Sequence, residues 1–360
     1  MPVATATRRF LASPLVDLLV GPHGIDRYLE LIRPNLTLRE ARAEVVGVRR
    51  QTDRSVTLTL RPNQAWGGFS AGQFVPVGVE IDGVRRTRTY SPAGSQHGRD
   101  GAIELTVTSH ADGVVSNHLR SQIAPGSILH LGPARGAFVL PAARPGKLVL
   151  ISGGSGVTPV LSMVRTLCDE GHAGEITFVH YSRTSADALY RAEVEALAAA
   201  HPNLCCAFVA TREGGGHVSA GAIAALAGDL DEAHAAVCGP PALIDAVRAI
   251  WDAVGAADRV LAETFTPPVP APAGATATGT LRFLRSDQQA AIGAGTLLEQ
   301  AEAAGLSPVF GCRMGICHTC TCRKSAGSVR NVLTGQTSAE EDEDIQLCIS
   351  VPAGDVALEL

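Results

Sequence analysis

The pattern of hydrophobic and polar positions changes character along the 360 residues of the chain. Between residues 40 and 143, short stretches such as 55–60 and 103–108 alternate polar and apolar side chains, and Gly and Pro residues separate them. Because neighbouring side chains of a strand point to opposite faces, this alternation predicts strands with one buried face. Many such strands in close succession predict a closed antiparallel β-barrel.

A different pattern follows between residues 144 and 266. Mostly apolar runs, the first two at residues 147–151 and 176–181, alternate with helical stretches such as 160–170. Strands that are apolar on both faces are typical of a parallel sheet that helices cover on both sides. We therefore expect an α/β domain built on a parallel sheet.

Proline and alanine dominate residues 267–278, which predicts a semi-rigid linker. The segment that follows begins with a strand near residues 281–283, and a helix is expected at residues 296–304. The pattern thus predicts a multidomain chain. Its parts are an N-terminal arm at residues 1–39, the antiparallel β-barrel at 40–143, the α/β domain at 144–266, the linker at 267–278 and an α+β domain at 279–360.

The N-terminal arm is rich in Leu and Ile with scattered charge at residues 10–32. This predicts an amphipathic segment that packs on the body of the protein or touches a membrane surface. The sequence has no apolar run of about 18 residues, so we expect no transmembrane segment. Nine cysteines without a recognisable signal peptide predict a cytoplasmic location, peripheral to a membrane only through a partner.

The charge of the chain is mildly acidic, with a formal net charge of −5, which argues against nucleic acid as a partner. Residues 279–360 hold ten acidic and six basic residues, so most of the acidic excess belongs to the last domain. Such a field steers docking on a basic protein partner. The alternative is that the acidic run at residues 340–344 is only a solvated helix start.

The last domain carries the strongest chemical signal of the chain. Its cysteines follow the spacing C-x4-C-x2-C with a distant fourth cysteine, which is the ligand spacing of a plant-type [2Fe–2S] ferredoxin. Gly311 and Gly315 let the loop backbone approach a compact cluster. The four predicted iron ligands are Cys312, Cys317, Cys320 and Cys348.

Other metal sites fit these residues less well. Structural zinc sites favour paired, short Cys spacings. A Rieske centre needs two His ligands, and His318 is the single histidine of this loop. Cys322 lies two residues after Cys320, and we expect it to be a non-ligand, with substitution for Cys320 as the alternative.

Two motifs of the predicted barrel suit a flat, phosphorylated cofactor. Arg88 and Tyr90 lie two residues apart at a strand end, so they share a face, and Ser91 follows. A Tyr ring can stack on a flat ring system, and an Arg can pair with phosphate. Further along, a helix begins whose free N–H groups and Ser hydroxyl would bind a pyrophosphate. The candidates in this second motif are Gly113, Val115 and Ser116.

The α/β domain opens with a glycine-rich turn between its first strand and its first helix. Glycines at this place let a pyrophosphate approach a helix N-terminus, and a Thr hydroxyl can add a donor. A Pro is favourable in the first helical turn. The candidate residues are Gly153, Gly154, Gly156, Thr158 and Pro159.

These motifs resemble, in kind and in order, those of the ferredoxin–NADP reductase family. The similarity spans about residues 40–360, and the C-terminal cysteines make the chain similar to reductases of the phthalate-dioxygenase-reductase type. The resemblance implies a barrel that binds FAD, with FMN as the alternative, an α/β domain that binds NAD(P)H and a β-grasp [2Fe–2S] ferredoxin domain. The matching motifs are Arg88-x-Tyr90-Ser91, Gly113-x-x-Ser116, Gly153-Gly154-x-Gly156-x-Thr158-Pro159 and Cys238-Gly239-Pro240.

The resemblance also implies roles for single residues in the barrel. Tyr90 and Ser91 would lie beside the isoalloxazine, whereas Arg88 and Ser116 would bind the diphosphate. We expect no nucleophile or general-base triad, because the redox chemistry belongs to the cofactors.

In the second domain, the resemblance implies that Cys238, with Gly239 and Pro240 after it, lies near the nicotinamide. A small buried Cys fits the local sequence equally well. The resemblance implies further that Glu263 and Phe265 reach back to the flavin, and the alternative is that they only begin the linker. The catalytic candidates are Tyr90, Ser91, Cys238 and Glu263.

The end of the second parallel strand indicates which nucleotide binds. An acidic residue there would bind a ribose 2′-OH, whereas an Arg accommodates a 2′-phosphate. The sequence has Ser182 and Arg183 at this point, with Arg191 as a further cation, which favours NADPH over NADH. The alternative for Arg183 or Arg191 is an ordinary helix salt bridge with Asp187.

The parts together predict an electron relay from NADPH through FAD and the [2Fe–2S] cluster to a protein acceptor. Residues 10–17 resemble actinobacterial reductases that serve acyl-CoA Δ9-desaturases, which favours a membrane-bound acyl-CoA desaturase or alkane hydroxylase as the acceptor. The alternatives are a soluble Rieske dioxygenase or cytochrome P450 system, and a redox sensor without turnover.

Overall fold

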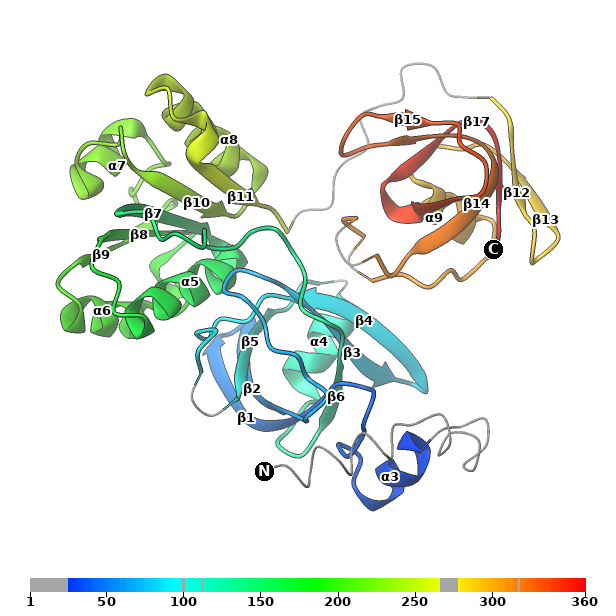
Figure 1. Cartoon of the computed structure of the whole chain (residues 1–360), viewed down its shortest axis with the longest axis horizontal. Coiled ribbons are helices and arrows are strands. Elements are labelled where there is room, and N and C mark those ends of the chain that lie inside the picture. Colours follow the sequence, from blue (N-terminus) through cyan, green and yellow to red (C-terminus); the bar gives the residue numbers. More distant parts are fainter. Residues whose placement is uncertain (1–24, 99–100, 112, 266–277, 312, 316–317) are drawn as a thin grey trace. The chain divides into compact units, whose positions relative to one another are not determined.

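The computed structural model describes residues 25–98, 101–111, 113–265, 278–311, 313–315 and 318–360 (Figure 1). The chain divides into two compact units, Met1–Phe265 and Thr266–Leu360. The first unit holds both the predicted barrel and the predicted α/β domain. The predicted ligands Cys312 and Cys317, most of the linker and the start of the N-terminal arm lie outside the described residues.

The barrel is a six-stranded antiparallel sheet with the strand order β4-β3-β6-β1-β2-β5, which confirms the predicted fold. An isolated bridge between Pro92 and Leu105 joins the chain after β4 to β5, so the two edges of the sheet meet. Helix α4 (Val114–Ser121) packs against β3, β4 and β5. The strands are β1 (Arg42–Thr52), β2 (Ser55–Pro62), β3 (Val75–Ile81), β4 (Val84–Tyr90), β5 (Ile103–Thr108) and β6 (Ile128–Leu131).

The α/β domain is a five-stranded parallel sheet with the order β11-β10-β7-β8-β9, also as predicted. Separate apolar clusters lie on its two faces, one under α5 and α6 and the other under α7 and α8 (Figure 1). The strands are β7 (Lys147–Gly153), β8 (Glu175–Ser182), β9 (Leu204–Ala210), β10 (His234–Cys238) and β11 (Val260–Glu263). The helices are α5 (Val157–Asp169), α6 (Arg191–Ala200), α7 (Ala220–Ala227) and α8 (Pro241–Ala253), with short 3-10 turns η1 (Gly154–Gly156), η2 (Ser185–Asp187) and η3 (Ala257–Arg259).

The second unit is a mixed sheet with the order β13-β12-β17-β14-β15, and β16 pairs with β14. Strands β12 and β17 are parallel, and α9 packs against β17. The strands are β12 (Thr280–Phe283), β13 (Gln288–Ala291), β14 (Thr321–Asn331), β15 (Thr337–Ser338), β16 (Glu343–Gln346) and β17 (Ser350–Leu358). The helices are α9 (Leu297–Ala303) and the 3-10 turn η4 (Leu347–Ile349).

The acidic run at residues 340–344 does not begin a helix, so that alternative was wrong. Residues 343 and 344, at the end of this run, begin strand β16, which pairs with β14. Lys324 on β14 is fully buried, and its ammonium lies 3.5 Å from the Glu343 carboxylate. The same ammonium donates to the carbonyl oxygens of Gly327, at 2.9 Å, and Glu340. A buried cation without partners would be costly, so the acidic run is held against the sheet.

The described part of the N-terminal arm contains helix α3 (Asp26–Ile32), which is attached to the barrel. Asp26 accepts hydrogen bonds from the backbone N–H of Leu38, at 2.6 Å, and of Arg39, at 3.0 Å. Glu30 pairs with Arg42 of β1 at 2.9 Å. Within the described residues, no helix is both long and apolar enough to cross a bilayer.

Candidate functional site

Arg88 and Tyr90 lie on the inner face of the barrel sheet. Strand register pairs them with Val77 and Val75, which are fully buried in the barrel core. Residues directly opposite each other share a face, so both motif side chains point to the side on which α4 packs. Burial raises the pKa of the Tyr90 phenol, and the charge of Arg88 opposes this shift without reversing it. Tyr90 is therefore a neutral, half-buried ring beside a cation.

The start of α4 supplies the second barrel motif. Gly113 is its N-cap residue, and Ser116 donates to the Gly113 carbonyl oxygen at 3.3 Å. Val115 is only 1 % exposed and packs in the barrel core, so its backbone N–H is what it can offer a ligand. The hydroxyl of Ser91 is buried, and the described residues provide no hydrogen-bond partner for it. An orphaned hydroxyl, a neutral ring and free helix N–H groups fit a flavin nucleotide.

The glycine turn of the α/β domain packs directly on the Cys238-Gly239-Pro240 segment. A Cβ on Gly156 would lie 2.2 Å from the carbonyl oxygen of Cys238, so a side chain there would force the backbone apart. A Cβ on Gly153 would lie 2.9 Å from Pro240 Cδ. The structure thus brings together two motifs that are about 80 residues apart in the chain.

Three other residues of this turn differ in what they can contribute. Gly154 is exposed and has a left-handed φ of 56°, a conformation that favours glycine. Thr158 is buried, and its hydroxyl donates to the Ser155 carbonyl oxygen at 3.3 Å. Pro159 lies in the first turn of α5, as expected. The Thr158 hydroxyl therefore shapes the turn, and its predicted bond to a pyrophosphate stays a prediction.

Cys238 and Glu263 are neighbours at the carboxyl ends of β10 and β11. They are directly paired in the parallel register, and the Gly239 N–H donates to the Glu263 carbonyl oxygen at 3.3 Å. Burial raises the pKa of the Glu263 carboxyl to about 8, and its Oε2 has no hydrogen-bond partner among the described residues. Burial and the nearby Glu263 raise the pKa of the Cys238 thiol. Phe265 packs against the core cluster that contains Cys238. Near neutral pH the pair is therefore an uncharged thiol and an uncharged carboxylic acid.

The ends of β8 and β9 carry two adjacent arginines. Arg183 is exposed, and the backbone N–H of Arg212 donates to its carbonyl oxygen at 2.9 Å. Arg212 is also exposed, and the described residues form no ion pair with either side chain. Ser182 donates to the Thr184 carbonyl oxygen at 2.7 Å. The acidic Glu213 is close by, but its carboxylate accepts from the Ser185 N–H at 3.1 Å.

Arg191, predicted as a further cation for the nucleotide, packs on an aromatic ring, and its role at the nucleotide stays a prediction. Its guanidinium lies 4.9 Å from the centre of the Phe208 ring. Asp187 accepts from the Thr184 hydroxyl at 2.8 Å and forms no ion pair with Arg183 or Arg191 within the described residues. Sequence reasoning missed Arg212, because a loop arginine 29 residues after Arg183 gives no spacing signal.

Helix α5 connects the nucleotide turn to the flavin motif. It begins directly after the glycine turn, and three of its side chains bond to the segment that follows Ser91. Ser162 donates to the Gly94 carbonyl oxygen at 2.7 Å, and the Gln96 N–H donates to Thr166 at 3.1 Å. Arg165 donates to the Ala93 carbonyl oxygen at 3.0 Å. One helix therefore extends from the nucleotide turn to the segment that follows the flavin motif.

In the second unit, the two predicted iron ligands within the described residues are buried in segments that a backbone hydrogen bond joins. Cys320 is 2 % exposed and Cys348 is 4 % exposed. The N–H of Leu347 donates to the Cys320 carbonyl oxygen at 3.2 Å, which brings the start of η4 to the start of β14. Gly315 has a left-handed φ of 76°, and a Cβ there would lie 2.6 Å from Ile349. Two buried sulfurs beside a tight loop fit a cluster, and the ligand roles of Cys312 and Cys317 stay predictions.

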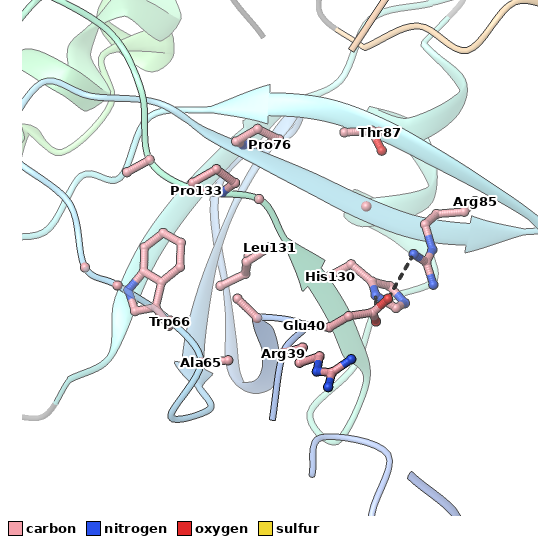
Figure 2. Close-up of a pocket in the computed structure, with 16 residues that line it drawn as sticks. Arg39, Glu40, Ala65, Trp66, Pro76, Arg85, Thr87, His130, Leu131 and Pro133 are labelled. Atoms are coloured by element: carbon pink, nitrogen blue, oxygen red, sulfur yellow. Dashed lines mark ion pairs between the residues drawn. The ribbon is translucent and has the colours of Figure 1, made fainter. Parts of the chain in front are cut away.

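A cavity of about 660 Å³ lies on the opposite, outer face of the barrel sheet (Figure 2). Pro76, Gly78 and Thr87 line it, and they alternate with the strand residues that face the core. Figure 2 shows Glu40 directed toward Arg85, and the two charges are 3.9 Å apart. None of the predicted site residues lines this cavity, so it is separate from the flavin motif.

Three protein families match successive parts of the chain. Residues 48–139 match the oxidoreductase FAD-binding domain family, residues 150–249 the oxidoreductase NAD-binding domain family, and residues 284–353 the 2Fe-2S iron-sulfur cluster binding domain family.

Similar proteins match most of the chain. An NADPH oxidoreductase of Mycobacterium tuberculosis is 37 % identical over 341 residues, which cover 93 % of this chain and 88 % of that protein. A glycine betaine monooxygenase reductase subunit of Pseudomonas aeruginosa is 29 % identical, with 81 % of this chain and 87 % of that protein covered. The ferredoxin reductase component of a 3-ketosteroid-9-alpha-monooxygenase of M. tuberculosis is 28 % identical, with 80 % and 84 % covered.

Among solved structures, phthalate dioxygenase reductase has the same fold. The comparison gives a TM-score of 0.61 at 22 % identity and covers 89 % of this chain and 98 % of that chain.

Proposed function

The chain belongs to the ferredoxin–NADP reductase family, in the form that joins FAD- and NAD(P)-binding domains to a C-terminal [2Fe–2S] domain, and from this premise we propose that it passes electrons from NADPH to an oxygen-activating partner protein. It is an NAD(P)H oxidoreductase and the reductase component of an electron-transfer system. The observation that best supports the proposal is α5, which begins at the nucleotide turn and bonds to the segment after the flavin motif.

The cofactors supply the redox chemistry, because FAD accepts two electrons from a nicotinamide and a [2Fe–2S] cluster accepts one at a time. The residues of the chain bind and orient these groups. We propose that Arg88 and the N–H groups at the start of α4 hold the FAD diphosphate, whereas Tyr90 and Ser91 contact the ring system. The glycine turn at residues 153–156 holds the nucleotide pyrophosphate.

The carboxyl ends of β10 and β11 shape the place where nicotinamide and flavin meet. We propose that Cys238 lies against the nicotinamide, that Glu263 faces the flavin and that Phe265 shields it. Both titratable groups are held uncharged near neutral pH, since burial raises the pKa of each. An uncharged, water-poor surface suits direct transfer between two stacked rings, because no charge must be resolvated during the step.

NADPH is the proposed electron donor. Arg183 and Arg212 present two guanidinium groups at adjacent strand ends, and a 2′-phosphate is a dianionic group that such a pair binds well. The Glu213 carboxylate, which would suit a ribose 2′-OH of NADH, is engaged with the backbone N–H of Ser185.

The proposed acceptor is a membrane-bound di-iron acyl-CoA desaturase or alkane hydroxylase. The resemblance of residues 10–17 to desaturase reductases supports this, although those residues lie outside the described part of the chain. The side chains of Leu31 and Ile32 on α3 are 76 % and 75 % exposed, and exposed apolar side chains suit a membrane surface.

A soluble oxygenase is the second candidate acceptor. Two of the similar proteins are named as reductase components of monooxygenases, one for glycine betaine and one for a 3-ketosteroid. A common reductase fold serves either acceptor, so the choice rests on surface features.

Absorption spectroscopy of the purified protein tests the proposed function. Flavin and iron–sulfur bands should both bleach when NADPH is added without oxygen, and ferricyanide or cytochrome c should then be reduced at many turnovers per second. Bands that bleach with dithionite but not with NADPH would contradict the proposal and leave a sensor without turnover.

A further inference from the structure

The barrel and the α/β domain meet around one buried tyrosine that has no role in any motif described above. Tyr190 is 3 % exposed and immediately precedes α6. Its backbone is left-handed, with φ 62° and ψ 15°. A bulky residue keeps such a conformation only where its surroundings hold it.

The hydroxyl of Tyr190 bonds to the other domain. It forms a hydrogen bond with the Thr106 hydroxyl and lies 3.2 Å from the Thr57 hydroxyl. These threonines are paired across β5 and β2 of the barrel, and their own hydroxyls are 2.7 Å apart. Thr57 belongs to the polar positions of β2, yet it is 1 % exposed, because the α/β domain covers this face. The two threonine hydroxyls of the barrel, which also bond to each other, thus bond to a tyrosine of the other domain.

Charged groups from both domains surround the tyrosine ring. The guanidinium groups of Arg165 and Arg49 lie 5.5 Å and 5.9 Å from its centre. Arg165 of α5 pairs with Glu104 of β5 at 2.7 Å and also with Glu193 of α6. Arg49 of β1 pairs with the same Glu193 at 2.7 Å. The two arginines and two glutamates come from both domains, and they pair with each other across the interdomain boundary around the Tyr190 ring. Such a network resists sliding of one domain on the other.

This cluster is joined to both binding motifs through α5. Arg165 also donates to the Ala93 carbonyl oxygen, two residues after Ser91. The same helix begins at the nucleotide turn. Transfer between two bound rings depends steeply on their placement, and a shift of about 1 Å can cost about 100-fold in rate.

We propose that Tyr190, with Thr57, Thr106, Arg165 and Glu193, forms an interdomain latch that sets the orientation of the nucleotide-binding domain on the flavin barrel. Tyr190 is then a positioning residue for electron transfer from nicotinamide to flavin. This inference rests on the proposed function for its kinetic consequence, whereas the latch itself is a structural statement that can be tested separately.

Rapid-mixing measurements on the full-length holoprotein test the kinetic consequence. Tyr190→Phe removes one oxygen and keeps the ring between the two arginines. We expect the first-order rate of flavin reduction at saturating NADPH to fall about five- to twenty-fold, with the Kd for NADPH changed less than about two-fold. A folded variant with a lower Tm and a full reduction rate would overturn the positioning role.

A double-mutant cycle links this loss to the partner on the barrel. Thr106→Val should lower the rate as Tyr190→Phe does, and the double variant should lose no more than either single variant. Thr59→Val is the matched control, since Thr59 lies on the same strand as Thr57 and the described residues give its hydroxyl no hydrogen bond. Additive losses, or an equal loss in the control, would overturn the latch.

Hydrogen exchange on the same proteins is independent of the reaction. In Tyr190→Phe, the amides of residues 93–96 and 190–194 should exchange faster, whereas those of β7 and β8 should not change. If the wild-type flavin is not reduced by NADPH, the proposed function fails, and this measurement still decides on the latch. Unchanged exchange at both segments would overturn it.

Discussion

Arg212 is the residue through which a neighbouring strand end would complete the proposed 2′-phosphate site. The cations predicted at this strand end were Arg183 and Arg191, and the backbone bond between Arg212 and Arg183 brings another cation beside Arg183. No periodic pattern could predict this pairing, because it depends on the parallel register of β8 with β9. The glycine-rich turn was predictable, since its residues are adjacent in sequence, whereas its close approach to Cys238 joins segments far apart in the chain.

Replacing either arginine should change which nucleotide the enzyme prefers. For Arg183→Ala and Arg212→Ala, we expect kcat/KM for NADPH to fall about 10- to 100-fold, because each removes a charge-assisted contact to the 2′-phosphate. The value for NADH should change less than about two-fold. Steady-state kinetics with both nucleotides measures this, and Arg248→Ala, an exposed arginine on α8, is the control. Equal losses with NADPH and NADH would contradict a 2′-phosphate site.

Glu263 should make the stability of the protein depend on pH. Burial raises the pKa of its carboxyl to about 8, from an ordinary value of 4.5. Between these two pH values the folded state keeps a proton that the unfolded state loses, so stability should fall as the pH rises from about 5 to 8 and level off above that. In Glu263→Gln this decline should be absent. Thermal unfolding at several pH values tests it, and parallel curves for the two proteins would mean that Glu263 is ionised throughout.

At the scale of elements, the antiparallel and the parallel sheet were predictable from the hydrophobic pattern. The contacts that other segments make with a sheet were not. Alternation at residues 55–60 predicted β2, and the apolar run at residues 147–151 predicted β7. The helix start given as the alternative for residues 340–344 was wrong, because the run leads into a strand beside the buried Lys324 of β14, and a lysine in a sequence gives no sign of being buried.

The start of β14 offers a sharp test of the cluster ligands, because two cysteines stand two residues apart there. Cys320→Ser should abolish the iron–sulfur absorption and the bound iron, since each iron of a [2Fe–2S] centre needs two protein sulfurs. Cys322→Ser should retain about two irons per chain and the visible spectrum. Both residues are buried, at 2 % and 8 % exposure, so the pair controls for the effect of a buried serine. Iron retained in Cys320→Ser and lost in Cys322→Ser would identify Cys322 as the ligand.

At the scale of the whole molecule, the sequence motifs indicate which cofactors bind, but they do not identify the electron acceptor. The motifs lie in loops and strand ends, whose chemistry is local, whereas recognition of a partner depends on surface residues that carry no fixed spacing. Helix α3 is the surface that we propose for this role. It is attached through Asp26 and the 2.9 Å pair of Glu30 with Arg42, and it presents Leu31 and Ile32 to solvent.

A truncation that respects these contacts can decide between the two acceptor classes. Removing residues 1–24 keeps α3 and its bonds to the barrel, whereas removal up to residue 38 would break the Glu30–Arg42 pair and uncover β1. With a membrane-bound acceptor, the truncated protein and the variant Leu31→Ser/Ile32→Ser should reduce a desaturase in membranes at least about five-fold more slowly, because each loses apolar area that holds the reductase at the surface.

Cytochrome c reduction should stay unchanged in both variants, since it needs only the flavin and the cluster. Lower rates with cytochrome c as well would indicate damage to the barrel and exclude a membrane role as the cause. If both variants serve the membrane desaturase at full rate, the arm has no part in docking and the soluble oxygenase becomes the favoured acceptor. Residues 10–17 would then no longer support a desaturase as the acceptor, because their removal would not affect electron transfer to it.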